Sequence, residues 1–224
     1  MRRFFTLNSL SIVFLLIFLA TLVGQAVAGH ADFNEEAMAH HESAISFGRY
    51  VTSSEFGQAV MENWQSEFLQ FSLYIFGTVY LIQRGSPESK KPGTAGRESD
   101  EDQLVGEHAK PDSPKWARVR GVRLFVYSNS LILLMTAIFL GTWFADSACG
   151  WSTYDSDQIS HHQPEVSYWG YLGTADFWES SLQNWQSEFL AIGSMAIFSV
   201  FLRQRGSPES KPVGAPHDET ATSG

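Results

Sequence analysis

The chain is poor in cysteine, since Cys149 is the only one among 224 residues. A single thiol excludes an internal disulfide and a thiolate metal cluster, and its expected role is that of a small apolar side chain. The sequence also lacks a Gly-rich phosphate loop, a His-Glu-x-x-His pattern and a nucleophile–base–acid arrangement. We therefore expect neither an enzyme nor a bound cofactor.

Charge is nearly absent from four apolar stretches. With their flanks, these stretches are long enough to cross a hydrocarbon core of about 30 Å. At that depth no water is available, so each segment has to satisfy its own backbone hydrogen bonds as a helix. The pattern predicts transmembrane helices at about 8–28, 62–83, 124–146 and 183–203.

Two phrases occur twice, each time 121 residues apart. Asn-Trp-Gln-Ser-Glu-Phe-Leu at 63–69 returns at 184–190, and Arg-Gly-Ser-Pro-Glu-Ser-Lys at 84–90 returns at 205–211. The register holds without a gap over residues 8–90, with about 30 of roughly 83 pairs identical, as expected of a duplicated unit. We predict an all-α membrane protein of two tandem parallel helical-hairpin repeats. Its parts are repeat 1 (1–90), a cytoplasmic linker (91–123), repeat 2 (124–211) and a disordered tail (212–224).

Basic residues are scarce on one side of this arrangement. Arg49 is the only lysine or arginine in the loops within the two hairpins, whereas the termini and the linker carry the others. By the positive-inside rule, both termini are cytoplasmic in a bacterial inner membrane. The net charge of −9 lies mostly in the outer loops, which argues against nucleic acid. The expected partners are the lipid bilayer and either further copies of the chain or an unidentified membrane protein.

The N-terminus has a second interpretation. Arg2 and Arg3, an apolar stretch and Ala26-Val27-Ala28 together resemble a cleavable secretory signal. Helix one aligns without gaps to helix three, which is internal, so we favour retention.

Polar residues recur inside the second and fourth predicted helices. Carboxylates at such a depth are costly and face protein or a water-filled cavity. They can serve as packing groups that hydrogen-bond between helices, or Glu67 and Glu188 can form a proton or cation pathway. Tryptophans beside this motif, and one before helix three, are expected as anchors at the membrane interface. The candidate polar residues are Asn63, Glu67, Gln70, Asn184 and Glu188, and the anchors are Trp64, Trp185 and Trp116.

Two histidine pairs occupy matching loop positions, His40-His41 and His161-His162. Four imidazoles from related loops could bind zinc at the outer face. Adjacent histidines rarely ligate the same ion, so surface histidines are the simpler interpretation. In the first of these loops, Ser53 or Ser54 is positioned to cap the helix that contains the second predicted span.

The second phrase resembles a helix stop. Gly85 and Gly206 follow an arginine and precede a proline, which is typical of a left-handed cap. A site made from both copies is the alternative, because Glu88 and Lys90 recur as well.

On these phrases, at 63–67 and 84–90, the chain resembles a family of small bacterial integral membrane proteins of unknown function. The resemblance implies a multi-pass membrane protein and supplies no activity, ligand or catalytic residue. We expect a structural or accessory, partner-binding membrane protein. The alternatives are the proton or cation pathway and, more weakly, outer-face metal binding.

Overall fold

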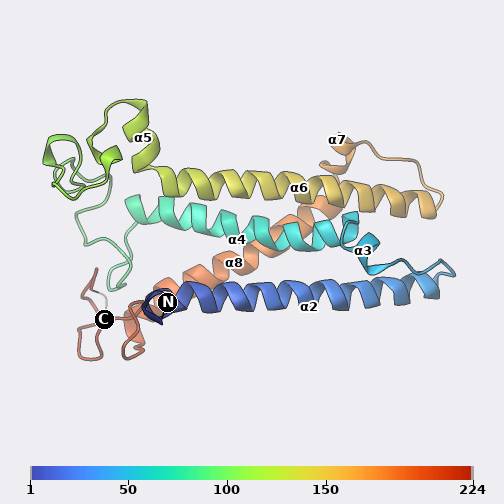
Figure 1. Ribbon diagram of the computed structural model, residues 1–224, viewed down its shortest axis with the longest axis horizontal. Coiled ribbons are helices and arrows are strands. Elements are labelled where there is room, and N and C mark those ends of the chain that lie inside the picture. The colour runs from blue at the N-terminus through green and yellow to red at the C-terminus, as the bar shows by residue number, and fades with distance from the viewer. Residues whose placement is uncertain (1, 223–224) are drawn as a thin grey trace. The chain divides into compact units, whose positions relative to one another are not determined.

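The computed structural model describes residues 2–222, and this range contains helices and no strand (Figure 1). The all-α prediction is confirmed. The elements in chain order are α1 (Arg2–Leu7), α2 (Ser9–Ala39), α3 (Phe47–Tyr50), α4 (Ser54–Tyr80), the 3₁₀ turns η1 (Gly106–His108) and η2 (Lys115–Arg118), α5 (Val122–Ser128), α6 (Ser130–Ser160), α7 (Tyr168–Tyr171) and α8 (Ala175–Phe201).

The chain divides into two compact units. The first unit is Met1–Val60 with Ala145–Tyr171, and the second unit is Met61–Phe144 with Leu172–Gly224. The first unit holds α2, α3, α7 and the last half of α6. The second unit holds α8, most of α4 and the first half of α6.

Helices α2 and α6 are longer than the predicted spans. Each has 31 residues and continues well past residue 28 or 146. In α2 the added segment contains good helix formers such as Glu35, Glu36 and Ala37. The added segment of α6 has few of them, so helix propensity does not account for its length. Each is also preceded by a break. The side-chain amide of Asn8 donates to the carbonyl of Phe4 at 2.8 Å, and that of Asn129 donates to Phe125 at 2.7 Å. The single helix predicted at 124–146 is therefore divided between α5 and the first part of α6.

Two helices among the described residues are long and apolar enough to cross a membrane, Ser9–Ala39 and Ser130–Ser160. This rests on length and composition alone. The other two predicted spans, 62–83 and 183–203, overlap α4 and α8 but run past their ends at Tyr80 and Phe201. These helices have 27 residues each and do not meet the same criterion. Their polar phrases, which begin at Asn63 and Asn184, lower the hydropathy of these helices.

Within the first unit, matching contacts occur 121 residues apart. The Tyr50 hydroxyl packs against Gly29, and the Tyr171 hydroxyl packs against Gly150, where a Cβ atom would collide with the tyrosine. Likewise, the Ile45 N–H donates to Asn34 Oδ1 at 2.8 Å, and the Val166 N–H donates to Asp155 Oδ1 at 2.6 Å. These contacts hold each loop against the helix that precedes it.

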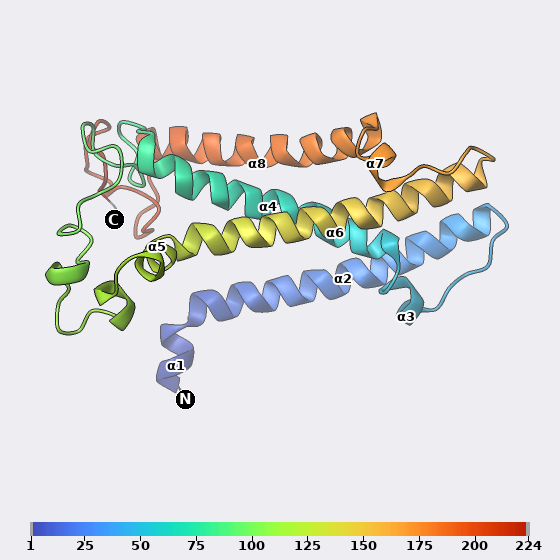
Figure 2. The same ribbon diagram turned by 90° about the horizontal axis from the view of Figure 1, so that it is seen from above.

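Helices α4 and α8 begin with matching caps. The Ser53 hydroxyl accepts from the Phe56 N–H, and the Thr174 hydroxyl accepts from the Phe177 N–H, both at 3.3 Å. Each cap satisfies one of the free N–H groups of the first turn. The predicted cap at Ser53 is confirmed. Within the second unit, α8 runs beside α4 (Figure 2).

Candidate functional site

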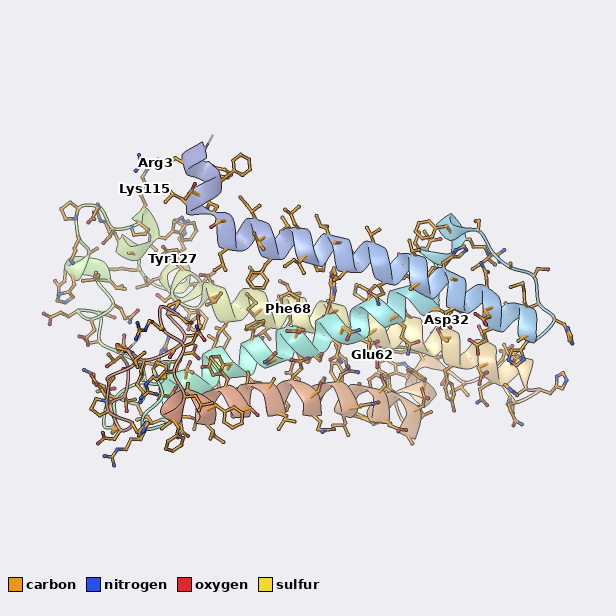
Figure 3. All side chains as sticks on the ribbon, turned by 90° about the horizontal axis from the view of Figure 1, so that it is seen from below. Arg3, Asp32, Glu62, Phe68, Lys115 and Tyr127 are labelled. Atoms are coloured by element: carbon orange, nitrogen blue, oxygen red, sulfur yellow. The ribbon has the colours of Figure 1, made fainter. Side chains whose placement is uncertain are left out.

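A polar seam joins α4 to α8. We use this name for Glu62 and Gln65 of α4 with Ser180, Asn184 and Trp185 of α8. Glu62 lies on α4 (Figure 3). The Ser180 hydroxyl and the Asn184 amide both donate to its Oε1, the latter at 2.8 Å. The Trp185 indole N–H donates to Gln65 Oε1 at 2.8 Å. Each bond joins a residue of α4 to a residue of α8, so the seam holds these two helices together.

The two copies of the first phrase lie in different environments. Gln65 and Ser66 are buried, with 0% and 2% of their surface exposed, whereas the equivalent Gln186 and Ser187 are exposed. The Gln65 side-chain nitrogen has no hydrogen-bond partner. An unmade bond of this kind costs roughly 1–3 kcal/mol. The Trp185 bond is therefore the one that compensates for burying this amide.

The predicted polar residues separate into two groups. Asn184 joins the seam, and Gln70 lines a cavity between α4 and α8. Asn63 and Glu67 are exposed, and Glu188 is half-buried. The Glu67 and Glu188 carboxylates lie close enough to interact electrostatically. Sequence reasoning missed Glu62, because its repeat partner is Gln183 and the position carries no repeated acid.

The predicted anchor Trp185 belongs to an aromatic cluster. Its ring centroid lies 5.8 Å from that of Trp143, which stacks on Phe139 at 5.7 Å and on Phe177 at 6.1 Å. Of the other anchors, Trp64 is half-buried, and Trp116 is exposed on η2 with its ring 6.3 Å from that of Tyr127.

The histidine pairs end helices. His41 and His162 adopt left-handed φ values of 62° and 57°. In the first pair, the His41 N–H donates to Met38 and the Glu42 N–H to Ala37, the two bonds of a Schellman motif. The second pair repeats this arrangement. His40 and His161 line a cavity of about 380 Å³ in the first unit, but no group of three potential metal ligands forms among the described residues.

The second phrase forms the same turn in both copies. The Gln83 N–H donates to Ser89 Oγ and the Gln204 N–H to Ser210 Oγ, both at 2.9 Å. Gly85 has φ +89° and Gly206 has φ +82°, so the predicted left-handed conformation is confirmed. The prediction that these two glycines lie at the ends of the helices is wrong. The helices end earlier, at Tyr80 and Phe201, and each glycine lies within the turn that follows.

The lysines of this phrase hold nearby loops. Lys90 Nζ donates to the Gly96 carbonyl at 2.8 Å and pairs with Glu98 at 3.1 Å. Lys211 is 1% exposed, and its ammonium donates to the carbonyls of Pro216, His217 and Glu219. Burial lowers the pKa of this ammonium from its ordinary value. The three carbonyls offset the loss of water around the buried charge.

The glutamates of the same phrase meet each other. Glu209 shares a side-chain hydrogen bond with Glu88, and this bond, with the nearby Glu88 charge, raises the pKa of the Glu209 carboxyl. The Tyr74 hydroxyl donates to Glu88 Oε2. Glu88 and Tyr74 also line the cavity between α4 and α8, whose volume is about 310 Å³. The sequence signal for the contact between Glu88 and Glu209 is that this glutamate occurs in both copies of the phrase.

The chain matches a protein-family profile described as "Domain of unknown function (DUF6766)" over residues 1–222. Neither the curated proteins nor the solved structures yield a match.

The seam predicts the effect of Trp185→Phe. This change removes the indole N–H and leaves both polar atoms of the buried Gln65 amide unbonded, so we expect a loss of roughly 1–3 kcal/mol in unfolding free energy. Unfolding in detergent micelles, followed by circular dichroism, measures it. Trp169→Phe is the matched control, because the Trp169 side chain is 79% exposed and should tolerate the change. Equal stability of the two variants would contradict a stabilising role for the seam.

Proposed function

The chain belongs to DUF6766, a domain of unknown function, and from that premise we propose that it is a multi-pass membrane protein with a structural or accessory role. Its four long helices, α2, α4, α6 and α8, cross a bacterial inner membrane as two parallel helical hairpins. Both termini are cytoplasmic. A partner binds to the first unit.

The distribution of polar and apolar side chains on α4 and α8 carries this proposal. Serines and Gln65 are buried, whereas large apolar side chains of both helices are exposed. In water this arrangement would expose an extended apolar surface. In lipid, small and polar residues at helix contacts with apolar residues outside are the expected pattern. The buried polar residues include Gln65, Ser66, Ser72, Ser181 and Ser199, and the exposed apolar ones include Phe71, Leu73, Phe76, Phe189, Leu190, Ile197 and Phe198.

The hydrogen bonds of the seam support a structural role for the repeated phrase. Gln65 and Asn184 are both engaged in hydrogen bonds between α4 and α8, as expected of packing groups. In the first unit, Trp169 and Phe47 are 79% and 45% exposed. Exposed aromatic side chains of this size are enriched at protein–protein interfaces, so we assign partner binding to this unit.

Labelling of single cysteines tests the topology. In a Cys149→Ser background, we expect a membrane-impermeant maleimide to label Ser43→Cys and Gln163→Cys in intact spheroplasts. Thr94→Cys and Thr222→Cys should react only after permeabilisation. A chain crossing only with α2 and α6 would place Thr94 on the same side as Ser43. Labelling of both in intact cells would therefore overturn the four-span arrangement.

Photocrosslinking tests the accessory role. A photoreactive amino acid at position 169 should give a discrete adduct with another membrane protein or with a second copy of the chain. The same amino acid at position 116 is the matched control, because Trp116 is also exposed but lies in the second unit. Absence of any adduct at 169, or identical adducts at both positions, would argue against a partner surface on the first unit.

The second candidate is a proton or cation pathway, favoured by the electrostatic interaction between Glu67 and Glu188. Under the structural proposal, liposomes carrying the protein show no proton or monovalent-cation flux above that of empty liposomes. Flux that disappears in a folded Glu67→Gln, Glu188→Gln variant would replace the structural proposal with transport. Flux that survives in this variant would point to a route elsewhere.

A further inference from the structure

The cavity between α4 and α8 has a mostly apolar wall that also carries polar groups. Leu73, Phe189 and Ile192 are among its apolar residues, and Tyr74 and Glu88 are among its polar ones. All of these residues belong to the second unit. A volume of about 310 Å³ is within the range of small-molecule sites.

The Glu88 carboxylate brings a negative charge to the cavity that no lining cation neutralises. Glu88 is the one charged residue among those lining this cavity, which include no lysine, arginine or histidine. The cations of the same phrase are engaged elsewhere. Lys90 pairs with Glu98, and Arg84 pairs with Asp218 at 3.1 Å. Charge complementarity therefore selects a cation and disfavours an anion.

Two side chains lie beside the Glu88 carboxylate. Its Oε2 accepts from the Tyr74 hydroxyl, and Glu209 from the second copy shares a hydrogen bond with it. Because Glu88 is the single charged residue that lines the cavity, the site complements one positive charge.

The wall decides which kind of cation fits. Metal ions such as Ca²⁺ need six to eight oxygen ligands, and Mg²⁺ needs an octahedron of them. This cavity offers mostly carbon. We propose that it binds an amphipathic monocation, with one ammonium group at Glu88 and an apolar body against Leu73, Phe189 and Ile192. This site belongs to the second unit and does not depend on a partner at the first.

Matched probes of one chain length test the proposal. We would measure binding of octylammonium, octanol and octanoate by equilibrium dialysis against the full chain in phosphatidylcholine nanodiscs, with empty nanodiscs subtracted. A hydrogen bond to a charged group is worth about 1.5–3 kcal/mol, so octylammonium should bind roughly tenfold or more tightly than octanol. Octanoate should bind most weakly. Equal affinity for octylammonium and octanol would overturn the proposal.

Two variants test the contributions of the Glu88 charge and of the apolar wall separately. Glu88→Gln should weaken octylammonium binding by about tenfold and leave octanol unchanged. Leu73→Trp should weaken both probes by filling the cavity. Glu107→Gln is the matched control, because it removes the same charge from an exposed side chain that does not line the cavity. Wild-type octylammonium affinity in a folded Glu88→Gln protein would refute the role of Glu88. If the Glu88→Gln protein does not fold, the proposal is still tested by the affinities of the three probes for the wild type and for the Leu73→Trp variant.

Discussion

The contact of α8 with α4 at Gln65 is the constraint on which the second unit depends. A buried amide is tolerated there only because the Trp185 indole reaches it from the other helix. Glu62 adds two bonds from the same partner helix. With the helices held at this point, the same pair encloses the cavity at Tyr74, and the turns that follow the two helices bring Glu88 to Glu209.

Each phrase occurs twice in the chain, but the fold places its two copies in different environments. Gln65 is buried, whereas its counterpart Gln186 is exposed. The cavity is similarly one-sided, because Gln70 and Tyr74 line it while their counterparts Ala191 and Met195 carry no hydroxyl or amide. The second copy contributes an apolar wall and the Glu209 carboxyl. The two copies therefore contribute different side chains to this one cavity.

Local features followed from the sequence more readily than contacts. The cap at Ser53 and the left-handed Gly85 depend on residues within one turn, and both were predicted. The histidine pairs show the limit of such reasoning. His41 lies in a Schellman motif only because α2 continues to Ala39, well beyond its apolar stretch, and a pattern of apolar residues does not show where the polar part of a helix ends.

By itself the sequence determined the all-α class, the repeat of 121 residues and the local turns that recur with it. Only the tertiary structure decided which copy of each phrase faces inward and which carboxylates meet. The physical reason is that a repeated phrase forms the same local hydrogen bonds wherever it occurs. Its burial, however, is set by the side chains packed against it, and here those partners come from the other half of the chain.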